Sequence, residues 1–223
     1  YEREVSGQGS FLTELRPCAV LFVRFMGIDY AAADAQPRLD GFIRQLQAIV
    51  ARYDGALLQL AIGDKGSYVY VNFGGLMAHE DDARRAVKTA LELRAASEEL
   101  QLQMGVTQGV MRVGAYGGST RCTYGAIGDD VNLSARLMTN AAPGEILVSG
   151  TLQKAVESRF TFEPRPPLAL KGKAEPVPAY RLVTVRATGE GHNRHLDSPM
   201  VGREKELEVL SRGQRAPHVG RKG

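Results

Sequence analysis

Strand-like apolar segments alternate with two amphipathic helical patterns in the first half of the chain, and this order constrains the fold most. Residues 18–25 form an apolar strand pattern, and the segment 36–55 repeats apolar residues at helical spacing. The predicted buried face of that helix comprises Leu39, Phe42, Ile43, Leu46, Ile49 and Val50. Residues 56–75 predict a hairpin, because two strand-like runs flank the turn-forming sequence GDKGS.

A second amphipathic helix and a further strand complete the pattern. The helix is predicted within 79–100, where an acidic start suits the positive end of a helix dipole. Its expected buried stripe comprises Ala83, Ala86, Val87, Ala90 and Leu91. A strand with a bend follows over 102–118. The order β-α-β-β-α-β predicts an α+β, ferredoxin-like (split βαβ) fold, with an antiparallel sheet and its helices packed on one face.

The rest of the chain divides into a shorter helix, more strands and a polar end. We expect a short helix over 129–141, a strand over 145–150, and β-rich closing elements with prolines at their margins over 154–183. Residues 1–16 are predicted to be a linker and 17–186 a folded domain. Residues 187–223 are predicted to be a linker and the start of a further module or a disordered tail, because their last stretch has no apolar periodicity.

Composition narrows the functional classes. The formal net charge of the 223 residues is only +3, and no Lys or Arg stripe follows a helical face, so we expect no nucleic-acid partner. No apolar run approaches the roughly 20 residues of a membrane span. The two cysteines, Cys18 and Cys122, are expected to be free thiols in a reducing, cytoplasmic compartment. Because the chain opens without Met, we expect it to be a piece of a longer protein.

Two polar features stand out against this apolar framework. Arg24 places a bulky cation inside the first apolar strand. Asn132 and Arg136 are four residues apart on a predicted helix, so their side chains project side by side. An amide beside a guanidinium suits a phosphate or a sugar oxygen, since arginine offers a fork of donors. The alternative is a solvent-facing polar pair with no ligand.

The text around these residues resembles the catalytic domain of class III nucleotide cyclases, the adenylate and guanylate cyclase family. The resemblance spans roughly residues 17–184. It lies in HEDDARRAVKTALEL, GVTQGVMRVGAYGG, IGDDVNLSARL, PGEILVSG and LKGKAEPVPAYRL, which occur in the family's order. The resemblance implies a ferredoxin-like domain that dimerises head to tail and binds a nucleotide between two such domains.

The family reaction assigns roles to particular positions. In these enzymes the ribose 3′-hydroxyl of a nucleoside triphosphate attacks its own α-phosphate, and pyrophosphate leaves. The resemblance implies that Asn132 positions the ribose and that Arg136 stabilises the charge developing on the α-phosphate. It also implies Mg²⁺ or Mn²⁺ held by two aspartates, because such hard cations prefer carboxylate oxygens.

The resemblance does not extend to both of the aspartates that hold the metals in the family. The first metal aspartate of the family falls on Arg24, which cannot ligate Mg²⁺ and is expected to pair with Asp64, to hold an anion, or to reach the edge of the cleft. The second falls on Asp64 when the IGD text is aligned, or on Ser67 when the chain is counted back from VNFG. Asp64 also suits a plain turn residue.

The pair of base-reading positions is degenerate as well. The first, a lysine in the family, falls on Leu60 or on Gly63, depending on that same choice of register. The second falls on Gly125, which has no side chain to distinguish adenine from guanine. The nearby Lys65 could reach around from the turn to this position, or be a solvated turn lysine.

Two functions from different classes follow from the resemblance. The first is the second, C2-like half of a composite adenylate cyclase of the soluble tandem type, in which an upstream C1-like domain supplies the metal aspartates and ATP is the substrate. The match of SPMVGREKELEVL to the opening of a P-loop ATPase module supports such a tandem arrangement. The second is a catalytically inactive pseudocyclase that dimerises, can bind a nucleotide or a small ion, and regulates the attached ATPase. The isolated chain could form a homodimer.

Overall fold

The computed structural model describes residues 13–63, 66–97, 99–117, 122–169 and 175–186. These residues all belong to the compact unit Tyr1–Ala187, and the second unit, Thr188–Gly223, lies outside them. The strands are β1 (Glu14–Met26), β2 (Ala56–Ala61), β3 (Ser67–Phe73), β4 (Gln101–Gly117), β5 (Cys122–Ile127), β6 (Ile146–Ser149), β7 (Phe160–Leu168) and β8 (Val177–Val185). The helices are α2 (Ala35–Arg52), α3 (Asp82–Ala96), α4 (Asp129–Asn140) and α5 (Gly150–Val156).

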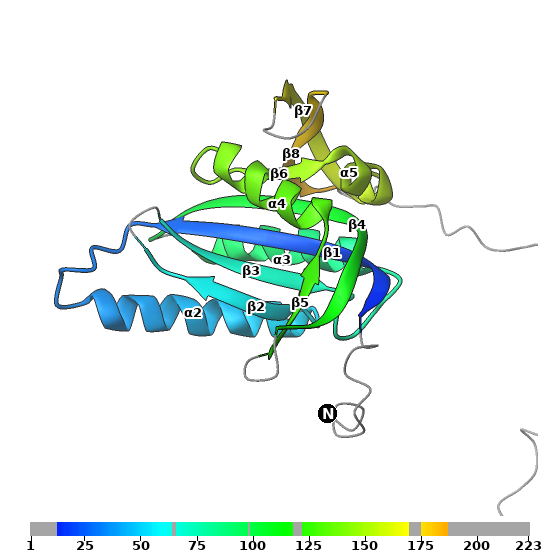
Figure 1. Cartoon of the computed structure of the whole chain (residues 1–223). Helices are drawn as coiled ribbons and strands as arrows, with labels where there is room; N and C mark the ends of the chain where they lie inside the picture. The colour runs from blue at the N-terminus through cyan, green and yellow to red at the C-terminus, as the bar shows by residue number, and fades with distance from the viewer. Residues whose placement is uncertain (1–12, 64–65, 98, 118–121, 170–174, 187–223) are drawn as a thin grey trace, which may run out of the picture. The chain divides into compact units, whose positions relative to one another are not determined.

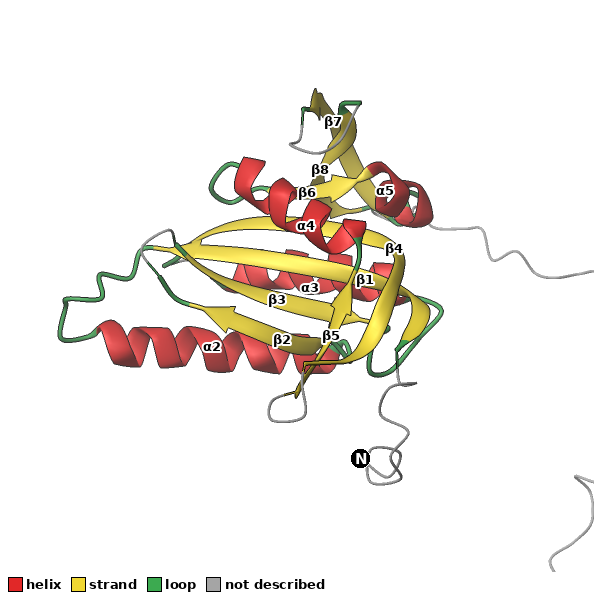
Figure 2. Ribbon diagram, in the orientation of Figure 1, coloured by secondary structure: helices red, strands yellow, loops and turns green. Residues whose placement is uncertain are grey.

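The strands form one sheet in the order β2-β3-β1-β4-β6-β8-β7, with β5 paired to β4 (Figures 1 and 2). Every pairing is antiparallel except that of β4 with β6, which is parallel. The α+β class and the β-α-β-β-α-β order of the first six elements are confirmed. The long strand β1 lies between β3 and β4 in this order and pairs with β4 along its whole length and with β3 over Ala19–Phe25.

One face of the sheet is covered by α2 and α3. Alternate residues of β1, from Ala19 to Phe25, enter this core, and the Phe25 ring packs against Phe42 of α2 with centroids 4.8 Å apart. The predicted apolar face of α2 is confirmed, because its inward positions are buried or packed against this cluster. Burying these side chains drives the packing, at about 25 cal/mol for each Å² of apolar surface removed from water.

The other face of the sheet carries α4, so the prediction that the helices pack on one face is wrong for this helix. The alternating β1 residues Cys18, Val20 and Phe22 point to this face and form a second cluster with side chains that include those of α4 and β5. Ser134 of α4 donates a hydrogen bond to the carbonyl of Gly105 at 2.7 Å. A side chain at Gly105 would prevent this approach, since a Cβ there would lie 2.0 Å from the Ser134 carbonyl oxygen.

Three features of the secondary structure differ from the sequence prediction. Strand β1 begins at Glu14, inside the segment expected to be a linker. The seven-residue helix α5 was not predicted, and its buried residues are Leu152 and Val156. Prolines lie inside β7 rather than at its margins, which an edge strand tolerates because one side of its backbone needs no partner.

Both cysteines are free, with Cys18 buried and Cys122 exposed. Burial raises the pKa of the Cys18 thiol. No helix among the described residues is long and apolar enough to cross a membrane.

Candidate functional site

Helix α4 is fixed at its start by the sheet beneath it. The Thr107 hydroxyl of β4 donates to the Asp130 carbonyl at 2.8 Å. Asp129 and Asp130 lie in the first turn, where their negative charge complements the positive end of the helix dipole. Because the inward-facing residues Leu133, Ser134, Leu137 and Met138 are buried, the rotation of the helix about its axis is also fixed.

This rotation places Asn132 and Arg136 together on the outer side of α4. Asn132 is exposed and Arg136 is half-buried, one helical turn further along. Within the described part of the chain, neither side chain makes a hydrogen bond or an ion pair. The Arg136 carbonyl, in contrast, accepts bonds from the side chains of Thr139 and Asn140, at 2.9 and 2.8 Å. The backbone of this turn is therefore held while an amide and a guanidinium remain available to a ligand.

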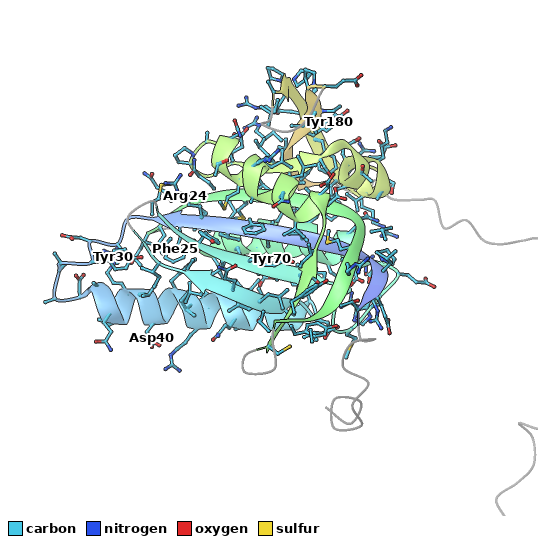
Figure 3. The ribbon with its side chains drawn as sticks, viewed as in Figure 1. Arg24, Phe25, Tyr30, Asp40, Tyr70 and Tyr180 are labelled. Carbon is cyan, nitrogen blue, oxygen red and sulfur yellow. The ribbon has the colours of Figure 1, made fainter. Side chains whose placement is uncertain are left out.

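Arg24 lies on the same face of the sheet as Val20 and Phe22, near the end of β1 (Figure 3). Its Nη1 donates to the Gln103 amide oxygen on the neighbouring strand β4, at 3.5 Å. Its guanidinium also lies against the backbone of Gly66, since a Cβ at Gly66 would be 2.6 Å from Nε. Arg24, where the resemblance predicts the first metal aspartate, thus places a cation near the end of β1.

The two positions predicted for the second metal aspartate, Asp64 and Ser67, provide no carboxylate among the described residues. Asp64 and Lys65 lie outside them. Ser67 is the first residue of β3 and is 2% exposed, and its hydroxyl is 2.6 Å from the Tyr30 hydroxyl. No group of three or more His, Cys, Asp or Glu side chains able to hold a metal occurs in the described ranges. The described residues therefore do not fit Mg²⁺ or Mn²⁺, because a guanidinium at this point repels a cation.

Of the two base-reading positions, Gly125 lines a cavity and Leu60 does not. The cavity has a volume of about 590 Å³ and lies between the β2 and β3 strands and the β4–β5 hairpin. A Cβ at Gly125 would meet nothing within 4 Å. Leu60 pairs with Val69, which belongs to the core beneath α2 and α3, so Leu60 faces the opposite side of the sheet. Gly63, the other candidate, is an exposed residue beyond the end of β2.

Gln59 faces the Gly125 cavity in place of Leu60. A β-bulge between Leu57 and Gln59 shifts the register, so that Gln59 pairs with Tyr70 on the site face. Its Nε2 donates a weak hydrogen bond to the Tyr68 hydroxyl at 3.5 Å. The sequence carried no sign of this bulge, and Gln59 was therefore missed.

Aromatic side chains make up much of the remaining cavity wall. Tyr70, Tyr116 and Tyr124 line it, and the Tyr70 ring stacks on Phe22 with centroids 4.8 Å apart. Burial raises the pKa of Tyr70, whose hydroxyl donates to the Ala126 carbonyl at 3.3 Å. These rings offer flat apolar surfaces, and none of the cavity's lining residues carries a charge.

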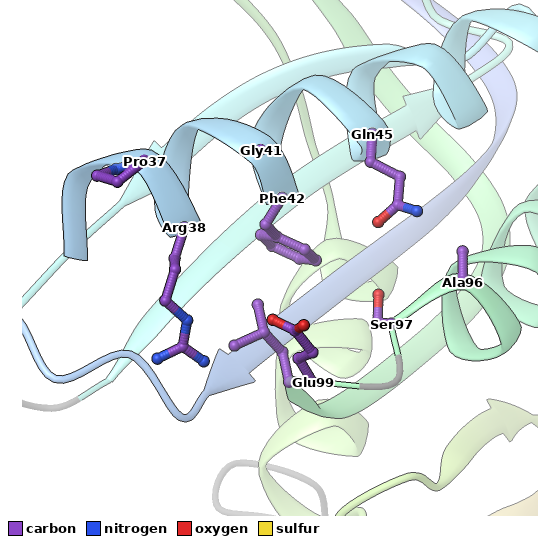
Figure 4. A pocket seen from close by; sticks show the side chains of 9 residues that line it. Pro37, Arg38, Gly41, Phe42, Gln45, Ala96, Ser97 and Glu99 are labelled. Atoms are coloured by element: carbon purple, nitrogen blue, oxygen red, sulfur yellow. The ribbon is translucent and has the colours of Figure 1, made fainter. Parts of the chain in front are cut away.

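A separate pocket of about 390 Å³ lies between α2 and the segment that joins α3 to β4 (Figure 4). Its walls include Arg38, Phe42, Ser97 and Glu99. It contains none of the residues predicted from the sequence to form the site, and the α4 face is on the other side of the sheet.

The fold and the α4 residues together define a nucleotide-cyclase type of domain: a long central strand, a β2–β3 hairpin beside it, and a helix that presents an Asn and an Arg. The chain belongs to the adenylate and guanylate cyclase catalytic domain family, whose profile matches residues 32–184.

Known cyclases resemble the chain in sequence and in structure. Human Adenylate cyclase type 10 is 26% identical over 211 residues, which are 88% of this chain and 13% of that protein. Adenylate cyclase 1 of Rhizobium meliloti is 26% identical over 151 residues, covering 61% of this chain and 22% of that protein. The crystal structure of the adenylyl cyclase CyaB from P. aeruginosa superposes with a TM-score of 0.72 at 26% identity, covering 78% of this chain and 97% of that one. The chain thus spans only a small part of the two full-length relatives.

Proposed function

We propose that the chain is the C2-like half of a composite adenylate cyclase, which converts ATP to cyclic AMP and pyrophosphate in the cytoplasm. The observation that carries the proposal is the contrast between the available Asn132 and Arg136 on α4 and the cation at Arg24. An upstream C1-like domain would pair head to tail with this one and bring two aspartates, together with the Mg²⁺ or Mn²⁺ that they hold. Residues 187–223 would lead into a P-loop ATPase module.

In this proposal the chain orients the ribose of the substrate and stabilises the charge that develops on its α-phosphate. The Asn132 amide would hydrogen-bond to the ribose and hold its 3′-oxygen in line with the α-phosphorus. As the new O–P bond forms and pyrophosphate departs, negative charge increases on the α-phosphate oxygens. Arg136 would donate hydrogen bonds to those oxygens, and its half-buried position strengthens the interaction relative to bulk water.

The 590 Å³ cavity is the proposed place for the nucleobase. A purine could stack on the tyrosine rings, since aromatic contacts tolerate any base. Gln59 lines the same cavity as Gly125, so its amide would take the base-reading role that a lysine has in the family. The proposal of ATP over GTP rests on the resemblance to adenylate cyclases.

A pseudocyclase is the second candidate, and the uncharged cavity favours it. Leu60 faces away from the cavity, Gly125 has no side chain, and no lining residue is ionised. A domain with this cavity could bind a nucleotide weakly, or none, and act by dimerising and regulating an attached ATPase.

A cyclase assay of the chain with and without its partner separates the two candidates. The composite enzyme predicts cyclic AMP from the mixture with the upstream domain and none from the chain alone, with GTP as a comparison substrate. A mixture that forms a stable dimer without making cyclic nucleotide would favour the pseudocyclase.

A further inference from the structure

The described helices leave open one stretch of the sheet face that carries α2 and α3. Along β1, the alternate side chains from Ala19 to Phe25 are buried beneath these helices. Leu15 and Pro17 precede them with the same alternation and therefore point to the same face. Both are exposed, Leu15 at 70%. The apolar face of β1 thus continues to the start of the strand, beyond the part that the helices cover.

Strand pairing extends this exposed stretch from β1 across β4 to β5. Pro17 lies opposite Val110, while Leu15 lies opposite Arg112, and Arg112 lies opposite Ile127 on its other side. Side chains in such opposite positions have their Cβ atoms only about 4.5–5.5 Å apart. Val110 is 64% exposed and Ile127 is 55% exposed. The open sheet patch, as we call it, comprises Leu15, Pro17, Val110, Arg112 and Ile127, and all of these side chains are accessible.

The open sheet patch has a cation between its apolar side chains. Arg112 is exposed and stands between Leu15 and Ile127 in one row across the strands. Its side chain makes no hydrogen bond or ion pair with any described residue. The charged neighbours of Leu15 along β1, Glu14 and Arg16, alternate to the other face and pair with each other at 2.7 Å. The patch therefore suits an apolar segment that carries a carboxylate.

The position and charge of the patch favour the segment that precedes β1 over a second copy of the chain. A two-fold contact brings the same surface of both copies together, so the two Arg112 side chains would face and repel each other. Residues 1–12 lie outside the described residues, and only Thr13 and Glu14 separate them from Leu15. They are therefore joined to the edge of the patch itself.

The sequence of residues 1–12, YEREVSGQGSFL, has the complementary chemistry. Tyr1 and Val5 are apolar, and the residues between them, ERE, add two carboxylates and one guanidinium. The following SGQGS contains glycines, which favour a reversal of chain direction. Three adjacent strands span only about 10 Å. Five extended residues reach about 17 Å, so residues 1–5 are long enough to cross the patch.

We propose that residues 1–5 dock on the open sheet patch, with Val5 against Val110 and Ile127 and with a glutamate carboxylate beside Arg112. Docking removes apolar surface from water and gives the guanidinium a counter-charge. It also ties the segment that enters β1 to the β4–β5 hairpin. The patch shares no residue with α4 or with the cavity of about 590 Å³, so this inference does not depend on the proposed cyclase activity.

Fluorescence of a single indole tests the docking, because the chain contains no Trp. In the full chain, Val5→Trp should give blue-shifted emission that acrylamide quenches weakly. Adding Val110→Asp, or Arg112→Glu, should release the indole, shift its emission to the red and raise the quenching constant severalfold. The matched control is Ile62→Asp, which changes an exposed apolar residue outside the patch and should keep the indole protected. An indole that is equally accessible in all of these chains overturns the proposal.

Thermal unfolding tests the native side chain at the same position. Val5→Asp should lower Tm by about 2–4 °C, and it should have no further effect in the Val110→Asp chain, where the contact is already lost. An equal effect in both chains overturns the proposal. Sedimentation velocity of the Val5→Trp chain then identifies the occupant. A protected indole in a monomer supports docking within one chain, whereas protection that appears only in a dimer assigns the patch to a second copy and overturns the proposal.

Discussion

The outer side of α4 and the end of β1 lie on the same face of the sheet, and each carries an arginine. The two arginines differ in their contacts. The Arg136 side chain has no partner among the described residues, whereas Arg24 lies against Gly66 and bonds to Gln103. The first arrangement leaves a guanidinium ready for a phosphate, and the second uses one within the fold. The described residues thus leave a guanidinium on α4 available to a ligand, whereas the guanidinium on β1 is held by its neighbours.

The largest effect on turnover is expected from Arg136→Ala in the chain mixed with its C1-like partner, and this variant tests the contrast between the two arginines. Removing a donor that serves the transition state should lower kcat by about 10²–10³-fold while KM changes little. Steady-state kinetics of cyclic AMP formation measures this. The control Arg44→Ala removes an exposed arginine paired with Asp40 on α2 and should leave both constants unchanged. Unchanged turnover in Arg136→Ala would remove this residue from the site.

Gly105→Ala tests whether α4 needs its close approach to the sheet. The added Cβ would lie 2.0 Å from the Ser134 carbonyl oxygen and 2.5 Å from the Met138 nitrogen, so α4 must shift. We expect a loss of about 1–3 kcal/mol in the free energy of unfolding. Gly125→Ala is the matched control, because its Cβ enters open space and should change stability by less than about 0.5 kcal/mol. Equal stability of the two variants, measured by denaturant unfolding, would contradict the packing described for α4.

Arg24→Met should have a smaller effect, and on stability rather than turnover. The variant keeps the length of the side chain and removes its hydrogen bonding to Gln103, which should cost about 0.5–1.5 kcal/mol. In the paired enzyme, kcat should remain near that of the unaltered chain. A loss of turnover as large as that of Arg136→Ala would show that the two arginines act in the same way, against the contrast drawn between them.

The smallest expected effect is that of Mn²⁺ on the chain alone. Because the described residues offer a guanidinium and a hydroxyl where the resemblance predicts metal ligands, millimolar Mn²⁺ should leave Tm unchanged. Differential scanning calorimetry with and without EDTA measures this. A clear rise in Tm with Mn²⁺ would mean that the chain holds a metal by itself.

Periodicity in the sequence was sufficient for the central fold. The apolar spacing of α2 predicted which of its side chains are buried, and the apolar run 18–25 predicted a buried strand at β1. The position of α4 was not predictable in this way, because it depends on a missing side chain at Gly105 and on the Ser134 hydroxyl that bonds there. Helix α5 was missed because seven residues with two buried apolar positions give too short a pattern.

The positions of the candidate site residues were predictable where they lie on a helix and not where they depend on strand register. Asn132 and Arg136 follow from a four-residue spacing, which a helix fixes. The first base-reading position was predicted at Leu60 or Gly63, whereas the bulge next to Leu58 turns Gln59 toward the cavity. A shift of one residue in a strand turns every following side chain to the other face, and sequence spacing alone does not reveal it.

The central claim is that this chain supplies Asn132 and Arg136 to a site whose metal-binding half lies on another domain. The most direct measurement mixes the chain with a C1-like domain that keeps both metal aspartates but has its own Asn and Arg replaced by Ala. Neither component alone should make cyclic AMP, and the mixture should make it with Mg²⁺ or Mn²⁺ and ATP. Cyclic nucleotide formed by this chain alone, or a stable mixed dimer that forms none, would contradict the claim.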